Sequence, residues 1–145
     1  MKLKLNLGCG QYRLPGFINL DKIDGWTWES GLPFKDESID AITESHSFMY
    51  IKDSDWPFVF SELKRVLKPS GILRITEDAT DNPLSLWYNG HPEAIALTSY
   101  DKIAGYLGDG FEVWKTLFNI SVDPTLLQNW HGGEPKVFFL EARKL

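Results

Sequence analysis

The feature of the sequence that most constrains its fold is a short strand that runs directly into two glycines. Residues 4–7 alternate polar and leucine side chains, and Gly8 and Gly10 follow at once. Glycine lets the backbone turn sharply and approach a ligand without a Cβ in the way. The exposed N–H groups of such a turn can bind a carboxylate or a phosphate. A strand that ends in this way predicts an α/β sheet with a binding site at its carboxyl edge.

Strand and helix patterns alternate along the chain, which is typical of a sheet covered by helices. The runs with the composition of strands are residues 4–7, 17–20, 39–43, 72–76, 113–122 and 136–143. Residues 56–67 place apolar side chains on one helical face after Asp55, and Thr98 with Asp101 predicts a second helix of about ten residues. The predicted fold is therefore α/β, with a mostly parallel sheet, helices on both faces and an antiparallel last strand.

Length and composition exclude several classes of protein. A chain of 145 residues fits one domain, residues 1–145, because domains typically have about 100–200 residues. Fifteen Lys and Arg against twenty Asp and Glu give a net charge of −5, which argues against a basic nucleic-acid surface. The single cysteine, Cys9, excludes a disulfide scaffold and a multi-cysteine zinc site within one chain. The sequence shows neither a membrane span nor a signal peptide, so we expect a cytoplasmic domain.

A carboxylate follows the second predicted strand. Asp21 lies eleven residues after Gly10, and an acid there can accept both hydroxyls of a ribose in an adenosine-containing cofactor. The dinucleotide fingerprint G-x-G-x-x-G is broken by Arg13, and its acid should follow about 20 residues on. A nicotinamide-dependent oxidoreductase therefore fits poorly. A tight turn with a solvated Asp is the alternative that these features alone leave open.

Four blocks of sequence resemble the class I S-adenosylmethionine-dependent methyltransferases. They are LNLGCG at residues 5–10, PGFINLD at 15–21, LPFKDESID at 32–40 and ELKRVLKPSGIL at 62–73. The blocks stand in the family's order and spacing, and they are similar to the small branch with a shortened first helix. A looser similarity runs from Gly110 to the end of the chain.

This resemblance implies a trimmed Rossmann-like methyltransferase fold that binds S-adenosyl-L-methionine and transfers its methyl group to an acceptor. Gly8, Cys9 and Gly10 match the loop around the methionine part of the cofactor. Asp21 matches the acid that binds the ribose. The family's known chemistry thus gives the glycine turn and the carboxylate one shared ligand.

The resemblance also implies further cofactor contacts. Glu29 is the nearest candidate for the acid that meets the adenine amino group, and Trp28 or Leu32 can supply an apolar surface for the ring. Glu44 and Ser45 match the strand end that lines the methionine and the transferable methyl. These residues complete the predicted cofactor site.

His46 and Asp78 are the candidate catalytic residues. His46 directly follows a predicted strand end, so it can act as general base toward a hydroxyl or amine acceptor. Asp78 follows the strand 72–76 and can orient the acceptor. A hydrogen-bonded structural histidine and a turn-capping aspartate are the alternatives. The loops expected at this edge of the sheet are residues 44–55, 77–98 and 123–135, which also hold His91, His131, Trp87, Tyr88 and Trp130.

No metal site is expected, because no H-x-x-x-H or H-E-x-x-H pattern links the histidines. Tyr12 stands where many relatives have a third glycine, and the first helix is nearly lost. The alternative to an enzyme is therefore a non-catalytic interaction module that binds S-adenosylmethionine or S-adenosylhomocysteine. The acceptor stays open among a small molecule, a sugar, a lipid and a protein, and a homodimer would cover exposed apolar faces.

Overall fold

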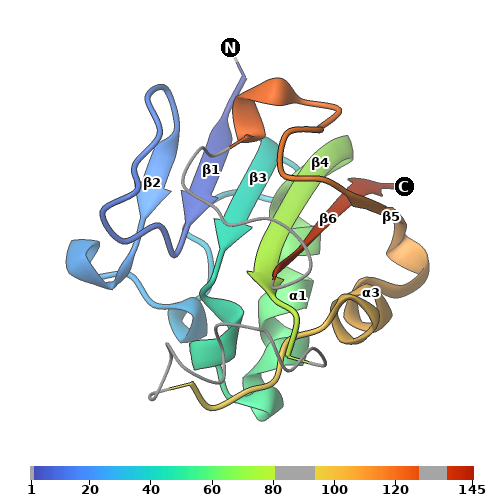
Figure 1. The fold of residues 1–145 in the computed structure, drawn as a ribbon. Coiled ribbons are helices and arrows are strands. Elements are labelled where there is room, and N and C mark those ends of the chain that lie inside the picture. Colours follow the sequence, from blue (N-terminus) through green and yellow to red (C-terminus); the bar gives the residue numbers. More distant parts are fainter. Residues whose placement is uncertain (1, 81–93, 128–136) are drawn as a thin grey trace.

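The structure, a computed structural model, describes residues 2–80, 94–127 and 137–145. Its strands form one sheet in the order β2-β1-β3-β4-β6-β5 (Figure 1). They are β1 (Lys4–Leu7), β2 (Ile18–Leu20), β3 (Ile39–Ser45), β4 (Leu67–Asp78), β5 (Phe111–Thr116) and β6 (Val137–Lys144). Strands β1 to β4 pair in parallel, and β6 runs antiparallel to both β4 and β5. The predicted α/β class and the antiparallel last strand are confirmed.

The two faces of the sheet differ in chemistry, because alternate side chains of a strand point to opposite faces. One face carries the buried apolar side chains Leu5, Leu7, Ile42, Leu73, Ile75, Leu140 and Ala142. The other face carries the buried polar side chains Asn6, Thr43, Arg74, Thr76 and Glu141. The sheet therefore needs an apolar cover on one side and hydrogen-bonding partners on the other.

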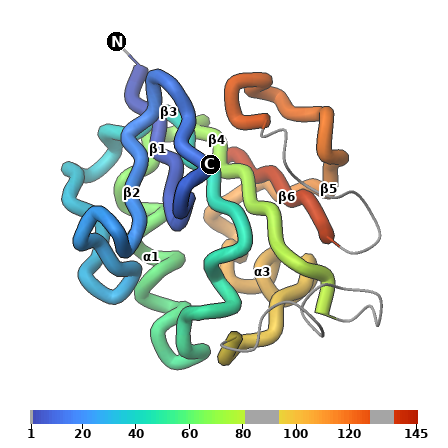
Figure 2. Tube along the Cα trace, turned by 60° about the vertical axis from the view of Figure 1, so that its left-hand side comes forward, coloured from blue at the N-terminus to red at the C-terminus, as the bar shows by residue number. Residues whose placement is uncertain are grey.

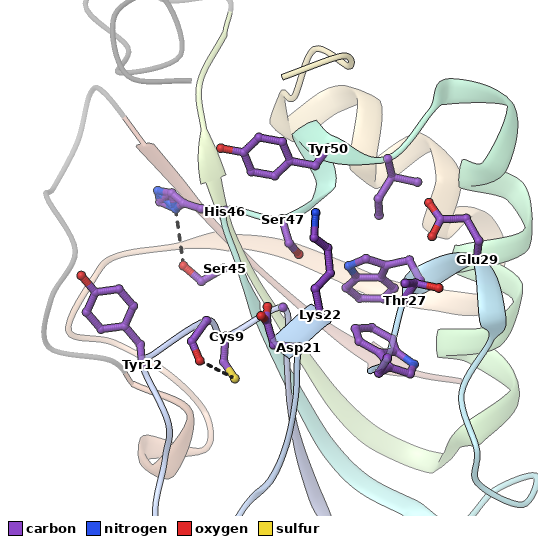
Figure 3. A pocket seen from close by; sticks show the side chains of 15 residues that line it. Cys9, Tyr12, Asp21, Lys22, Thr27, Glu29, Ser45, His46, Ser47 and Tyr50 are labelled. Carbon is purple, nitrogen blue, oxygen red and sulfur yellow. Dashed lines mark hydrogen bonds between the residues drawn. The ribbon is translucent and has the colours of Figure 1, made fainter. Parts of the chain in front are cut away.

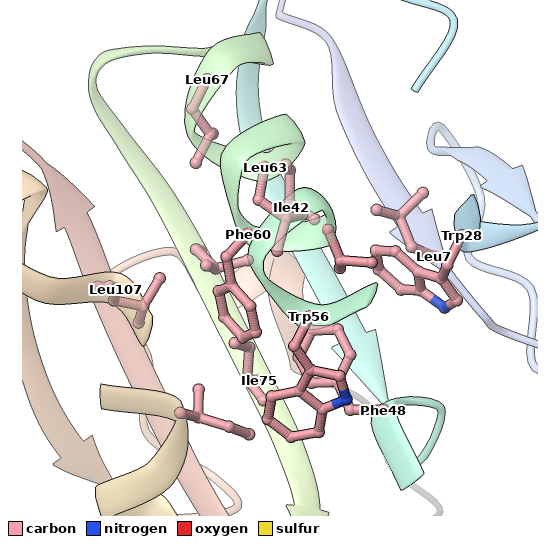
Figure 4. Close-up of a cluster of buried hydrophobic side chains, with 14 of the residues drawn as sticks. Leu7, Trp28, Ile42, Phe48, Trp56, Phe60, Leu63, Leu67, Ile75 and Leu107 are labelled. Atoms are coloured by element: carbon pink, nitrogen blue, oxygen red, sulfur yellow. The ribbon is translucent and has the colours of Figure 1, made fainter. Parts of the chain in front are cut away.

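Helices cover the apolar face. The buried stripe of α1 (Trp56–Val66) packs on β3 and β4 (Figure 4), and α3 (Tyr100–Leu107) lies beside α1 and adds Ile103 and Leu107 to the same core (Figure 2). In the described part of the chain, both α-helices thus belong to one face. We expected helices on both faces of the sheet, and the described residues place α-helices on the apolar face alone.

The polar face is crossed by residues 117–127 instead. The Arg74 guanidinium donates to the carbonyl oxygens of Leu117 and Ile120 at 2.8 and 2.7 Å. These hydrogen bonds explain why the strand predicted at residues 113–122 ends earlier than expected. β5 ends at Thr116, and the chain then crosses the polar face of the sheet.

The position of the loop predicted at residues 123–135 changes accordingly. Asp123 accepts a hydrogen bond of 2.9 Å from Lys4, at the start of β1. The described part of this loop, residues 123–127, therefore lies toward the edge where β1 begins, and not toward the carboxyl edge that was predicted. His131 and Trp130 lie outside the described residues, as do His91, Trp87 and Tyr88.

Several predicted boundaries need correction. The helix predicted at 56–67 is confirmed as α1, but β4 begins at Leu67, before the predicted Ile72, and passes Ser70 at a φ of 68°. The cap of α3 is Ser99, whose hydroxyl accepts from the Lys102 N–H, and not Thr98. Thr98 is instead fully buried and donates to the Asp78 carbonyl oxygen at 2.6 Å.

The edge next to β1 is built from short pieces. β2 has three residues, and the Asn19 side chain hydrogen-bonds to both the N–H and the carbonyl oxygen of Leu14. Two 3-10 turns, η1 (Lys22–Asp24) and η2 (Trp28–Ser30), then lead toward β3. They place residues 21–30 beside the end of β1. Within the described residues, no helix has the length and apolar character needed to cross a membrane.

Candidate functional site

A cavity of about 580 Å³ opens at the carboxyl ends of β1, β2 and β3 (Figure 3). Small-molecule sites typically enclose roughly 300–1,000 Å³. The predicted site residues that line it are Gly8, Cys9, Gly10, Asp21, Glu29, Ser45 and His46. Lys22, Trp26, Thr27, Trp28, Ser47, Tyr50 and Ile51 add to its wall, as does Tyr12. Segments far apart in the sequence thus meet around one small-molecule-sized space.

The glycine turn forms the floor of the cavity at the end of β1. Gly8 and Gly10 have φ angles of 64° and 54°, a backbone region that favours glycine. A Cβ on Gly8 would lie 2.5 Å from Ser47 Oγ, whereas a Cβ on Gly10 would meet nothing within 4 Å. Gly8 is therefore needed for close packing, and Gly10 faces open space. Burial raises the pKa of the Cys9 thiol between them, which favours its neutral form.

Asp21 stands at the cavity wall after β2. One carboxylate oxygen accepts from the Ile23 N–H at 3.3 Å, so the side chain caps the turn η1. The other oxygen has no hydrogen-bond partner among the described residues. One oxygen of Asp21 therefore caps the turn, and the other is available for the predicted contact with a ribose. Glu29 lines the same wall and is exposed.

Trp28 brings an unused hydrogen-bond donor to the wall. Its indole packs against Trp26 and Phe48, with ring centroids 4.9 and 5.2 Å away. The Nε1 atom is buried and has no partner among the residues that the structure describes. A buried N–H without an acceptor is unfavourable. The indole of Trp26, in contrast, donates to the Gly31 carbonyl oxygen at 2.9 Å.

His46 reaches the cavity from the end of β3, at a φ of 55°. Its Nδ1 lies 3.4 Å from the Ser45 hydroxyl (Figure 3), and its Nε2 lies 3.5 Å from Asp78 Oδ1. Asp78 is fully buried and does not line the cavity. The structure therefore brings the two predicted catalytic residues together, with Asp78 placed behind the imidazole.

Two predicted cofactor contacts lie behind the wall. Leu32 is buried in the core, and its N–H donates to Glu62 of α1 at 2.9 Å. Glu44 is fully buried on the helix side of β3, because it alternates with Ser45 along the strand. Neither side chain lines the cavity. Period-two alternation could have placed Glu44 on the face opposite Ser45.

Sequence reasoning missed Ser47 and Glu77. Ser47 lines the cavity next to Gly8, and its N–H donates to both Glu44 and Glu77 at 3.0 Å. Glu77 is fully buried at the end of β4, and burial together with the neighbouring Glu44 raises its pKa well above the usual value. The only sequence signal was an acid directly before the last residue of each of two adjacent parallel strands.

Comparison with known proteins agrees with this geometry. A sequence profile of the methyltransferase domain family matches residues 27–75. The demethylmenaquinone methyltransferase of Streptomyces avermitilis is 34% identical over 93 residues, which cover 59% of this chain and 39% of that protein. The chain thus matches about two fifths of the length of this curated relative.

Solved structures of methyltransferases have the same fold. An S-adenosylmethionine-dependent methyltransferase of Thermotoga maritima, described as a possible histamine N-methyltransferase, superposes with a TM-score of 0.67 at 20% identity and covers 100% of this chain and 83% of that one. One from Archaeoglobus fulgidus gives 0.64 at 15% identity, over 99% and 86% of the two chains. The partial sequence matches and the shared fold agree with the resemblance to the class I S-adenosylmethionine-dependent methyltransferases that the sequence blocks indicated.

Proposed function

We propose that this chain binds S-adenosylmethionine in the cavity at the end of β1 and transfers its methyl group to an acceptor beside His46. The observation that carries the proposal is the convergence of the glycine turn, Asp21 and His46 on one space of about 580 Å³. The relationship to methyltransferases supports the choice of cofactor.

The lining of the cavity supports this choice of cofactor. The open turn at Gly10 can hold the amino-acid end, and the free oxygen of Asp21 can accept from a ribose hydroxyl. The unused Trp28 N–H calls for an acceptor atom on a ligand, because a buried donor gains a hydrogen bond when one is bound. Glu29 stands near the same end of the wall and is the candidate acceptor for the adenine amino group.

His46 is the proposed general base. When bound, S-adenosylmethionine supplies a methyl group activated by a positively charged sulfur. In the proposed tautomer the ring proton is on Nε2, which lies 3.5 Å from Asp78 Oδ1, and the lone pair is on Nδ1, on the side of Ser45. That nitrogen can take a proton from a hydroxyl or amine acceptor, while the buried carboxylate of Asp78 fixes the ring and stabilises its charged form. The acceptor then belongs to the compounds that lose a proton on methylation.

Calorimetric titration with S-adenosylmethionine, S-adenosylhomocysteine and a nicotinamide dinucleotide tests the first half of the proposal. We expect the first two to bind and the dinucleotide not to bind. The Asp21→Asn variant is the matched control, because the amide can still cap η1 but accepts more weakly from a ribose. A chain that binds the dinucleotide alone would refute the cofactor assignment.

Transfer of a labelled methyl group tests the second half. The acceptor panel starts with demethylmenaquinone and histamine, which appear in the names of the relatives, and continues with simple phenols and primary amines. We expect His46→Gln to reduce transfer about 10²–10⁴-fold, the usual contribution of a general base, while cofactor affinity changes little. Cofactor binding without transfer to any acceptor, including those in a cell extract, would favour the non-catalytic module.

A further inference from the structure

Two buried carboxyl groups stand directly behind the cavity wall. Glu44 lies directly before the last residue of β3 and Glu77 directly before the last residue of β4, and both side chains are fully buried. Each accepts a hydrogen bond of 3.0 Å from the same donor, the Ser47 N–H. The shared donor shows that the two carboxyl groups are close neighbours. Glu44 also accepts from the Ser47 hydroxyl at 2.9 Å, and Glu77 from the Phe48 N–H at 3.1 Å. Together the two acids fasten residues 47 and 48 to the sheet.

These groups cannot both be ionised at low cost. Two buried like charges repel, and each is also separated from water. The remaining oxygens, Glu44 Oε2 and Glu77 Oε1, receive no N–H or O–H from other described residues. The carboxyl groups lie within hydrogen-bonding reach of each other, and burial raises the pKa of both. One proton between them removes one charge and supplies the missing donor.

Among the described residues, the surroundings of the two acids offer no simpler compensation. Across the sheet, Glu44 faces Leu7 and Ile75, and Glu77 faces Phe138. The nearest titratable side chains along the strands are His46 and Asp78, which contact each other at 3.5 Å, and Tyr100 of α3 packs on Phe138. Among the causes that shift the two carboxyl groups, none of the leading ones is a cation.

We propose that Glu44 and Glu77 share one proton and that Glu77, through this pair, is a positioning residue for the cofactor cavity. The pair fixes Ser47, whose hydroxyl occupies the space that a Cβ on Gly8 would need. It also fixes the point at which the chain leaves β3 through His46. Loss of the shared proton would let the two acids repel and would release the wall that faces the glycine turn. The effect on ligand binding rests on the function proposed above.

The test compares Glu77→Gln with Glu77→Leu. The amide of Gln can donate to Glu44 and accept from Ser47 and Phe48, so it copies the protonated acid without titrating. Leu removes every one of these hydrogen bonds. Glu112→Gln is the control, because it removes one acid from the exposed surface of β5. The amide resonances of Ser47 and Phe48 and the affinity for S-adenosylhomocysteine are followed against pH.

In the ligand-free wild type, we expect both amide resonances to titrate above the ordinary carboxyl range, and Glu77→Gln to abolish that titration. At alkaline pH, the affinity of the wild type for S-adenosylhomocysteine should fall relative to that of Glu77→Gln. Because the ligand ionises equally in both measurements, the ratio of the two affinities is free of that effect. Glu77→Leu should bind roughly tenfold or more weakly at every pH, as expected for lost charge-assisted hydrogen bonds. Glu112→Gln should follow the wild type throughout.

Two results would overturn the inference. An unchanged amide titration in Glu77→Gln would show that the pair does not hold the proton. Wild-type affinity in Glu77→Leu, or in Glu77→Ala if the first variant does not fold, would remove the positioning role. A wild type that binds no S-adenosyl ligand would instead defeat the proposed function, and the amide titration of the ligand-free protein would still decide the shared proton.

Discussion

In the described part of the chain, two buried pairs of ionisable side chains hold loops on the sheet, and the pairs differ in the signs of their groups and in the face on which they lie. On the polar face, Arg74 and Glu141 form a buried ion pair at 2.9 Å, and their remaining polar atoms bind the backbone of residues 117–122. On the helix face, Glu44 and Glu77 are two acids, and they bind the backbone of residues 47 and 48. Both pairs thus fasten a loop to the sheet.

The difference lies in what each pair needs. Opposite charges compensate each other, so the ion pair of Arg74 and Glu141 holds its loop without an additional proton. Two like charges need a proton, so the fastening of Ser47 depends on the medium. The first pair is expected to support mainly the fold, and the second mainly the shape of the cavity.

The largest expected effect breaks the opposite-charge pair. Glu141→Ala leaves the buried Arg74 guanidinium without its counter-charge and should lower the free energy of unfolding by about 3–5 kcal/mol. Urea unfolding followed by circular dichroism measures it. Glu112→Ala, which breaks an exposed pair with Arg143, should lower it by only about 0–1 kcal/mol. Equal effects of the two variants would contradict the structural role given to Arg74 and Glu141.

A second prediction concerns the contact between the glycine turn and the like-charge pair. Gly8→Ala places a Cβ 2.5 Å from Ser47 Oγ at a φ of 64° and should lower the free energy of unfolding by about 1–3 kcal/mol. Gly10→Ala is the matched control, because it meets strain at a similar φ but no neighbour. In a Glu77→Leu background Ser47 can shift, so the cost of Gly8→Ala should shrink. An unchanged cost would mean that Glu77 does not hold Ser47.

A third prediction separates the site from the fold. Asp21 belongs to neither buried pair. Because Asp21→Ala removes the carboxylate that is proposed to bind the ribose, it should weaken S-adenosylmethionine binding by about 1–3 kcal/mol. Asp21→Asn should retain the cap of η1 and lose less affinity for S-adenosylmethionine than Asp21→Ala does. Calorimetric titration of both variants decides the matter. Unchanged affinity in a folded Asp21→Ala protein would remove Asp21 from the site and leave it the capping role alone.

The smallest expected effect concerns the indole donors. Trp28→Phe removes the unused N–H at the wall and should weaken ligand binding by about 0.5–1.5 kcal/mol, the net value of one neutral hydrogen bond. Trp26→Phe removes a donor that is already paired with Gly31, so it should lower the free energy of unfolding instead. Thermal unfolding and calorimetry on both variants measure the two effects. Equal losses of affinity would show that the Trp28 N–H meets no ligand atom.

Much of the fold could be predicted because it depends on local patterns. The apolar stripe of α1 and the strand ends at Gly8 and Asp21 are visible in the sequence, and the order of blocks indicated the family. The path of residues 117–127 could not be predicted, because it is set by Arg74, more than forty residues earlier in the chain. Likewise, the start of β4 at Leu67 depends on pairing with β3 and not on its own turn-like Pro and Gly.

The candidate site was predicted where the backbone makes it and missed where buried side chains make it. Gly8, Gly10 and Asp21 follow strand ends, and parallel strands bring such ends together. Glu44 was predicted to line the cavity because it matches the strand end that does so in the resembling family, but its side chain points to the face opposite that of Ser45. Glu77 carried no motif, and its role depends on a neighbour thirty-three residues away that only strand pairing reveals.

The three-residue strand β2 has a consequence for how copies of this protein meet. An outermost strand offers unpaired N–H and carbonyl groups to a second chain, and long flat borders of this kind invite aggregation. Here the border is short, and Asn19 turns its amide back onto the main chain of Leu14. On this side of the sheet, the short β2 therefore leaves little template for another molecule to extend.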